Sequence, residues 1–177
     1  VGVGDFVEVD SDYLPESFYE KHKRYSAIQG DIAIALTRPI IDSGIKVCLV
    51  PESYNNALVN QRVALVRPKP TLAKKHFIYH YLSSPVVVNY VKEKSKTLMQ
   101  PNLSIKDLGL LAVPLPSLEE QQSIVKAIEE EMQLVNANKR LIEIFEQKIK
   151  TKIGEVWGVK EEETLSMAAE PQTEYNK

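Results

Sequence analysis

Apolar residues in roughly the first two thirds of the chain come in short runs, which polar and turn-forming residues interrupt. Such runs, bounded by Gly, Pro, Asn or Ser, are typical of strands in a folded domain. The runs that predict strands lie at residues 31–36, 46–50, 62–66 and 110–113. Two stretches with helical spacing, 71–82 and 85–94, predict helices, and Ser84 is placed to cap the second. Residues 1–116 therefore have the pattern of an α+β domain with a curved mixed or antiparallel sheet and short helices.

The pattern then changes to one long helix. Ser117 and Glu120 form a capping box at its start, and no Pro or Gly interrupts the turns that follow. Large apolar residues recur at steps of three, four or seven and form one stripe: Ile128, Met132, Val135, Ile142, Phe145, Ile149 and Ile153. A helix over 117–156 is about 60 Å long, more than a small domain covers, so the stripe predicts a coiled-coil partner. The Glu-containing residues 157–177 have the composition of a disordered tail.

Charge is unevenly distributed along a chain whose formal net charge is -2. Residues 61–116 carry nine Lys or Arg against two Asp or Glu, whereas residues 1–60 carry five against nine. A basic block within an acidic protein indicates an anionic partner, of which nucleic acid is the commonest. A solvated surface explains such a block about equally well, so the charge alone leaves both interpretations open.

The sequence contains no recognisable motif for catalysis. Its seven glycines are dispersed and form no phosphate-binding loop. His76 and His80 are four residues apart, but Phe77 stands where a zinc-protease helix has glutamate, so neither metal nor cofactor is expected. The single cysteine, Cys48, forms no internal disulfide, which is typical of a reducing cytoplasm. No apolar run approaches the ~20 residues of a membrane-spanning helix.

Five strings of the sequence carry a family likeness. They are GDIAIAL at 30–36, NQRVALVRPK at 60–69, FIYHYLSS at 77–84, QPNLSIKDL at 100–108 and LLAVPLPSLEEQ at 110–121. In content and order they resemble the specificity subunits of type I restriction–modification enzymes, in which a Pro-Leu-Pro segment precedes a long conserved helix. The resemblance implies a DNA target recognition domain over 1–116, incomplete at its N-terminus, and a spacer and dimerisation helix over 117–156. The chain would be half of a two-part subunit, as a natural half-subunit or as a fragment.

The same resemblance implies a non-catalytic, cytoplasmic component of a larger enzyme. Such a component reads one half of a bipartite site in double-stranded DNA. Its long helix docks the methyltransferase subunits, and the restriction subunit joins the same assembly. Because this chain has one such helix, a homodimer with antiparallel helices is expected, and its two-fold symmetry would match a palindromic split site.

Target choice is expected in stretches that differ between members of such a family, here 19–29, 37–46 and 84–100. The candidate DNA-binding residues are Arg38, Lys46, Lys92, Lys94, Lys96 and Gln100. An arginine such as Arg38 is suited to a guanine edge, which it binds through two N–H groups, whereas lysines are suited to phosphates. For each of these residues, a solvated surface position explains the residue type equally well.

Two rival interpretations stay open. A coiled-coil dimer whose globular head binds another protein, without binding DNA, explains the helix but leaves the basic block without a role. An enzyme with an unfamiliar site is the second rival, and no motif supports it. Binding to DNA that weakens steeply with salt would support the DNA-binding specificity subunit over both rivals.

Overall fold

The computed structural model describes residues 1–8, 13–95 and 102–158. The candidates Lys96 and Gln100 and the end of the predicted tail, 159–177, lie outside the described residues. Contacts divide the chain into two compact units, Val1–Lys126 and Ala127–Lys177. The first unit contains the sheets and the short helices, and the second consists, as far as it is described, of a single helix.

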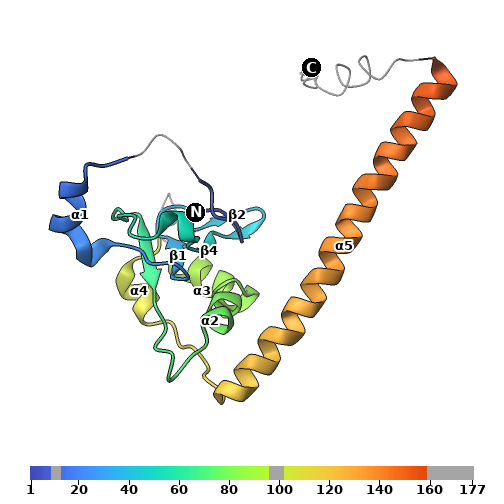
Figure 1. Cartoon of the computed structure of the whole chain (residues 1–177). Coiled ribbons are helices and arrows are strands. Elements are labelled where there is room, and N and C mark those ends of the chain that lie inside the picture. The colour runs from blue at the N-terminus through green and yellow to red at the C-terminus, as the bar shows by residue number, and fades with distance from the viewer. Residues whose placement is uncertain (9–12, 96–101, 159–177) are drawn as a thin grey trace, which may run out of the picture. The chain divides into compact units, whose positions relative to one another are not determined.

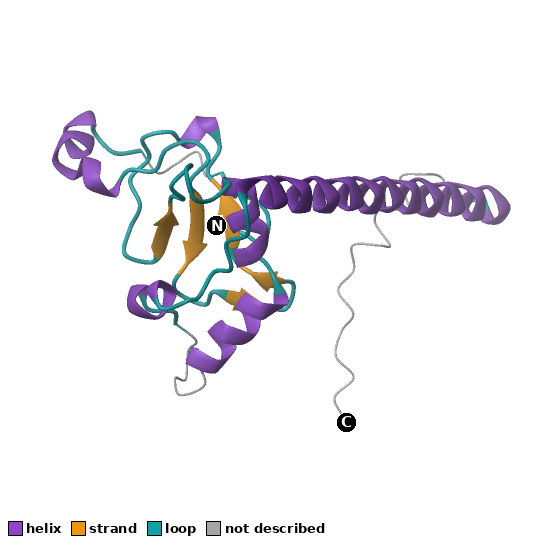
Figure 2. Ribbon diagram, turned by 90° about the horizontal axis from the view of Figure 1, so that it is seen from below, coloured by secondary structure: helices purple, strands orange, loops and turns teal. Residues whose placement is uncertain are grey.

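A three-stranded antiparallel sheet forms the centre of the first unit (Figures 1 and 2). Strand β1, Ile32–Ala35, lies between β4, Val47–Leu49, and β5, Val63–Val66. Every residue of β1 is buried, which explains why its sequence is a continuous apolar run and not an alternation. The three predicted strands are confirmed, each a residue or two shorter than its apolar run.

The two faces of this sheet pack into two apolar clusters. The isoleucines of β1 belong to the larger cluster, together with residues of α2, Lys75–Leu82, and α3, Pro85–Ser95. Ala33 and Cys48 belong to the smaller cluster. Because successive strand residues point to opposite faces, alternating Ile and Ala in β1 fit a thick apolar layer on one side and a thin one on the other. The α+β class predicted from the sequence is therefore confirmed.

A second ladder forms a short hairpin from β2, Ile40–Ile41, and β3, Gly44–Ile45. No strand was predicted in 40–45, because strands of two residues are too short to carry a hydrophobic pattern. Helix α3 packs against β2, and Ile45 is buried. The hairpin is thus attached to the core.

The hydrophobic pattern did not predict the short helices that lack an apolar face. α1, Glu16–His22, and η1, Lys23–Tyr25, contain no buried residue, so no periodicity marks them. The short 3-10 helix η2, Glu52–Tyr54, follows β4. α4, Ile105–Gly109, begins at its cap Ser104, whose hydroxyl accepts a hydrogen bond from the backbone N–H of Asp107, the third helical residue.

Two expectations about the core are wrong. Residues 110–113, all of them described, form no strand. Instead, the Tyr81 hydroxyl donates a 2.8 Å hydrogen bond to the Ala112 carbonyl, so a side chain satisfies a backbone group that a ladder would otherwise use. The predicted Ser84 cap is also wrong, since its hydroxyl is buried without a hydrogen-bond partner among the described residues.

Helix α5, Leu118–Trp157, begins in the first unit and continues as the second. Its predicted capping box is confirmed: the Glu120 N–H donates to Ser117 Oγ at 3.2 Å, and the Ser117 N–H donates to Glu120 Oε2 at 2.9 Å. Hydrogen bonds from the Ser117 hydroxyl and N–H hold the pKa of Glu120 below its ordinary value. The start of α5 is therefore fixed by its own side chains.

The second unit leaves its apolar stripe exposed. Met132, Ile142 and Phe145 expose 46%, 56% and 55% of their surface. Only the first residue of the stripe, Ile128, is partly buried. Among the described residues, no helix combines the length and the apolar character needed to cross a membrane.

Candidate nucleic-acid interface

Arg38 lies where the chain leaves β1 and enters the β2–β3 hairpin. Its φ of 47° is in the left-handed region, which is uncommon for a residue other than glycine. The next residue, Pro39, is fully buried, and its carbonyl accepts a hydrogen bond from the Lys46 N–H at 2.7 Å. The candidates Arg38 and Lys46 are therefore held on neighbouring backbone segments at the base of one hairpin.

Helix α3 carries the described candidate lysines beside this hairpin. Val87 and Val91 are buried and fix which face of α3 meets the core, whereas Lys92 and Lys94 are exposed. The ammonium group of Lys94 lies 5.6 Å from the centre of the Tyr90 ring. Because α3 packs against β2, the fold joins the element that carries these lysines to the hairpin that follows Arg38.

Three more contacts hold this region in place. Thr37 forms an isolated bridge with Asn102, and the Leu103 N–H donates to the Leu36 carbonyl at 2.8 Å. The Tyr90 hydroxyl donates to the Asp107 carbonyl at 2.7 Å and ties α3 to α4. The described ends of the segment that contains Lys96 and Gln100 are thus fixed to the same region.

An ion pair between buried Asp31 and exposed Arg67 supports the other end of the sheet. Asp31 is 2% exposed and accepts hydrogen bonds from Arg67 Nε at 2.7 Å and from a terminal Arg67 nitrogen at 2.6 Å. The Ile28 N–H donates a third, at 2.9 Å. Burial alone would raise the pKa of Asp31, but these hydrogen bonds hold it below its ordinary value. The pair is a structural clamp, and sequence analysis did not identify it.

Gln121 joins the start of α5 to the globular unit. Its side chain is fully buried. The amide donates to the Leu72 carbonyl at 3.1 Å and to the Pro116 carbonyl at 2.9 Å, and its oxygen accepts from the Lys74 N–H at 2.8 Å. Because this contact occupies Lys74, α2 begins at Lys75 and not at the predicted residue 71. The sequence offered one signal, the Gln of LEEQ, which the resemblance noted without a physical role.

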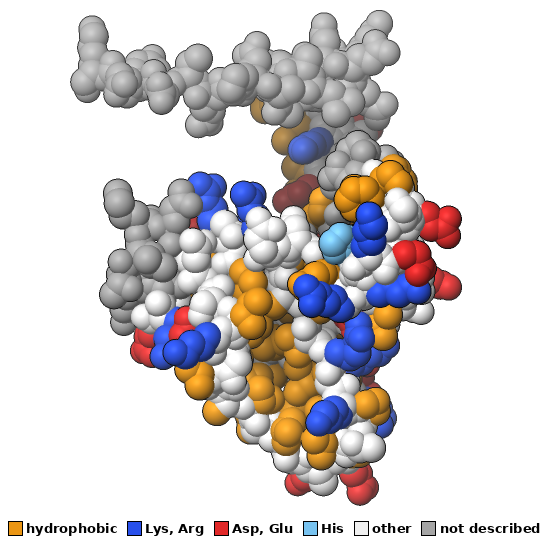
Figure 3. All heavy atoms as spheres, turned by 90° about the vertical axis from the view of Figure 1, so that its left-hand side faces the viewer, with side chains coloured by type: hydrophobic (Ala, Val, Ile, Leu, Met, Phe, Trp, Pro, Cys, Tyr) orange, Lys and Arg blue, Asp and Glu red, His pale blue; other side chains and the backbone are white. Residues whose placement is uncertain are grey.

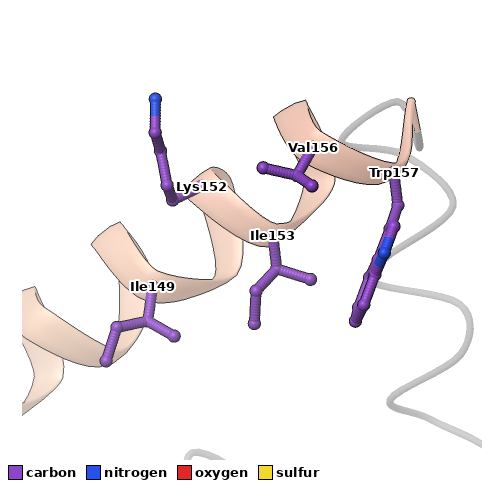
Figure 4. A pocket seen from close by; sticks show the side chains of 5 residues that line it. All are labelled: Ile149, Lys152, Ile153, Val156 and Trp157. Carbon is purple, nitrogen blue, oxygen red and sulfur yellow. The ribbon is translucent and has the colours of Figure 1, made fainter.

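Other chemistry in the described residues is sparse. They contain no cluster of His, Cys, Asp and Glu that could hold a metal ion. Burial raises the pKa of the Cys48 thiol, which makes it a poor nucleophile. An open hollow of about 320 Å³ near the end of α5 is lined by Ile149, Lys152, Ile153, Val156 and Trp157 (Figure 4). All five come from one helix, so this hollow is part of the apolar stripe and not a cofactor pocket.

Comparisons with known proteins give one consistent result. Residues 5–147 match the family described as type I restriction modification DNA specificity domain. The type I restriction enzyme MjaVIII specificity subunit of Methanocaldococcus jannaschii is 32% identical over 155 residues, which are 84% of this chain and 36% of that protein. The type I restriction enzyme EcoBI specificity subunit of Escherichia coli is 32% identical over 126 residues, 70% of this chain and 26% of that protein.

A solved structure agrees with the sequence matches. The crystal structure of the HsdS subunit from Thermoanaerobacter tengcongensis superimposes with a TM-score of 0.58 and 25% identity, over 74% of this chain and 34% of that one. The chain thus spans about a third, or less, of the length of the relatives that it matches.

Proposed function

This chain belongs to the type I restriction modification DNA specificity domain family, and we propose that it binds double-stranded DNA and reads one half of a bipartite site. The contact between the β2–β3 hairpin and α3 carries the proposal. It joins the hairpin flanked by Arg38 and Lys46 to the helix that exposes Lys92 and Lys94. Cations on adjoining elements suit a phosphate backbone better than scattered surface charges do.

The candidate residues have different roles in this proposal. Lys92 and Lys94, together with Lys96 and Gln100 outside the described residues, contact the DNA backbone and set the register of the domain on DNA. Arg38 contacts a base edge, for which its two-pronged guanidinium is suited. Its left-handed backbone supports this role, because such a conformation costs a non-glycine residue about 1–3 kcal/mol and is commonest at functional sites.

The long helix serves assembly in this proposal. Residues 1–116 recognise the target, and the helix that starts at Leu118 spaces and pairs the recognition domains. The exposed stripe supports this division, because burying one large apolar side chain contributes about 1.5–3 kcal/mol. A second copy, antiparallel to the first, is the proposed partner of the stripe. The same helix docks methyltransferase subunits, and the restriction subunit joins through them.

Catalysis belongs to those partner subunits, and the chain itself is non-catalytic in this proposal. Its relatives are specificity subunits, which supports the assignment. The proposed site of action is the cytoplasm, where bacterial and archaeal DNA lies.

A salt titration tests the DNA proposal. Binding of the chain to a mixed-sequence duplex should weaken linearly on a log–log plot as salt rises. Replacing Lys92, Lys94 and Lys96 together by Ala should weaken binding to all sequences similarly and lower the magnitude of the salt slope by up to about 3. The matched control replaces Lys148, Lys150 and Lys152 of α5 by Ala, which removes the same charge from the other unit.

The outcomes separate the proposal from its rivals. A wild-type chain that binds no duplex at low salt would favour the coiled-coil module whose head binds protein. If both triple variants lost the same DNA affinity, binding would depend on the net charge of the chain and not on the lysines of α3. Cleavage or methylation of DNA by the purified chain, with cofactors supplied, would contradict its non-catalytic role.

A further inference from the structure

The segment made of α1 and η1 protrudes from the first unit without joining its core. None of its residues is buried, and Phe18 and Tyr25 each leave 45% of their surface exposed. Figure 1 shows this segment at the edge of the globular unit, beyond the sheet. A helix that buries nothing contributes little to folding, so its aromatic side chains need another explanation.

The segment is nevertheless held firmly at one end. The Tyr19 hydroxyl donates to Asn56 Oδ1 at 3.1 Å. The Val59 N–H donates to the Tyr25 carbonyl at 3.0 Å, and Ser26 forms a bridge with Leu58. These contacts fix part of the segment in the free protein, so ordering it on binding would cost less conformational entropy than for an unattached segment.

Two cations of the segment contact aromatic rings of the same segment. Four residues in sequence, Lys21 to Arg24, are Lys, His, Lys and Arg. The guanidinium carbon of Arg24 lies 4.5 Å from the centre of the Tyr25 ring, and the Lys23 ammonium lies 5.5 Å from that of Tyr19. An arginine stacked on a ring keeps its N–H groups at the edge of the stack, where they can donate to phosphate oxygens.

Not every cation on this segment is available to bind a phosphate. Lys23 forms an ion pair with Glu20 at 2.8 Å, both side chains being largely exposed. Lys21 and Arg24 are exposed as well. Figure 3, which views the molecule from the side where α1 lies in Figure 1, shows Lys and Arg side chains next to a strip of hydrophobic ones. Adjacent cationic and apolar groups match the phosphates and deoxyriboses of a DNA backbone.

We infer that the α1–η1 segment, Glu16–Tyr25, is a second DNA-contacting element of this domain. Arg24, oriented by Tyr25, and Lys21 bind backbone phosphates, and the exposed face of Tyr25 packs on the adjoining sugar. The inference rests on the proposed function, because it assumes that the domain binds DNA. It names backbone-contacting residues on an element that overlaps the stretch 19–29, from which no candidate DNA-binding residue was taken.

Single substitutions in the full chain test the inference on a mixed-sequence duplex across a salt series. Arg24→Ala should weaken binding about fivefold to tenfold at low salt and lower the magnitude of the salt slope by about 1. Arg24→Lys should keep the slope, because the charge stays, but should bind more weakly than wild type, because the planar stack is lost. Tyr25→Ala should also weaken binding at an unchanged slope, and Tyr25→Phe should bind like wild type.

Arg140→Ala, which removes an exposed arginine from α5, is the charge-matched control and should change affinity less than twofold. Because the segment contains no buried side chain, its variants should have the melting temperature of the wild type, which thermal unfolding can measure. A wild-type chain that binds no duplex removes the proposed function and this inference together. Wild-type binding with unchanged affinity and slope in Arg24→Ala, or an equal loss in Arg140→Ala, overturns this inference alone. The surface would then belong to a protein partner.

Discussion

Replacing Gln121 by Glu should detach the start of the long helix from the globular unit. The substitution keeps the shape of the side chain and exchanges one NH₂ group for an oxygen. The carboxylate still accepts from the Lys74 N–H, but it no longer donates to the carbonyls of Leu72 and Pro116. Both carbonyls would lose the bond that Gln121 provides and would face a negative oxygen in a site with no solvent exposure.

The magnitude follows from these two lost bonds. A fully buried polar group left unsatisfied costs about 1–3 kcal/mol, so about 2–6 kcal/mol is the upper range for these two carbonyls, whose hydrogen bonds are part-buried. The free energy of unfolding of a domain is about 5–15 kcal/mol in total, so the loss is large in proportion. Burial raises the pKa of the introduced carboxyl, and the protonated form recovers one donor. The folded variant therefore binds more protons than the unfolded chain, and its deficit relative to wild type should grow as the pH rises.

The neighbouring residue provides the control. Gln122→Glu makes the same chemical change one residue later, at an exposed position in the first turns of the helix, where a carboxylate is tolerated. Denaturant unfolding at several pH values should show a change within about 0.5 kcal/mol for Gln122→Glu and the large, pH-dependent loss for Gln121→Glu. Hydrogen exchange of the Lys74 amide should be faster only in Gln121→Glu, because detachment of the helix start would transiently open the hydrogen bond that the carboxylate still accepts. Equal stability of the two variants from mildly acidic to neutral pH would refute the argument.

Three further predictions concern the Asp31–Arg67 ion pair, the proposed base contact of Arg38 and the proposed pairing through helix α5. Arg67→Ala should destabilise the fold by about 2–3 kcal/mol near neutral pH, below the range for a fully buried pair because Arg67 is 54% exposed. Since the pKa of Asp31 is lowered in the fold, that loss should narrow below about pH 4, and a loss independent of pH in denaturant titrations would contradict it. Arg38→Gly should be more stable than Arg38→Ala by about 1 kcal/mol, because glycine adopts a φ of 47° without strain. Both should lose about 1–3 kcal/mol of discrimination in competition binding, and unchanged discrimination would remove Arg38 from base contact. Ile142→Asp with Phe145→Asp should convert dimers into monomers in sedimentation, whereas a wild-type chain that is already monomeric would contradict the proposed pairing.

The sequence predicted the elements whose signals are local. Strand β1 was recognisable because a buried strand reads as one apolar run between turn residues. The capping box of Ser117 and Glu120 was recognisable because both partners lie within four residues. The predicted strand at 110–113 failed because its outcome depends on the Tyr81 hydroxyl, which lies 31 residues from the Ala112 carbonyl it contacts. Local pattern contains no information about such a contact.

The candidate site shows the same division. Charge and family likeness make Arg38 and the α3 lysines candidates, but they do not predict the left-handed backbone of Arg38, because the residue is an arginine and not a glycine. Gln121 appears in the helical pattern as one more polar position. Its burial depends on Leu72 and Lys74, nearly 50 residues earlier in the chain. Hydrophobic periodicity is therefore least able to predict buried polar residues such as Gln121.

The attachment of α5 to the globular unit and its proposed role in pairing should be separable by mutation. Its first turns are buried with the globular unit, where Gln121 and Val125 expose 0% and 2% of their surface. Its later turns expose the stripe, so the free energy of burying that stripe is available for assembly and not for folding of the first unit. Gln121 and Ile142 are 21 residues apart on one helix, about 30 Å along its axis. Substitutions at such a separation have additive effects unless the two processes are coupled. Combining Gln121→Glu with the two aspartate substitutions should therefore add their separate losses in folding and pairing. A loss of pairing in Gln121→Glu alone would show that α5 must be attached to the globular unit in order to pair.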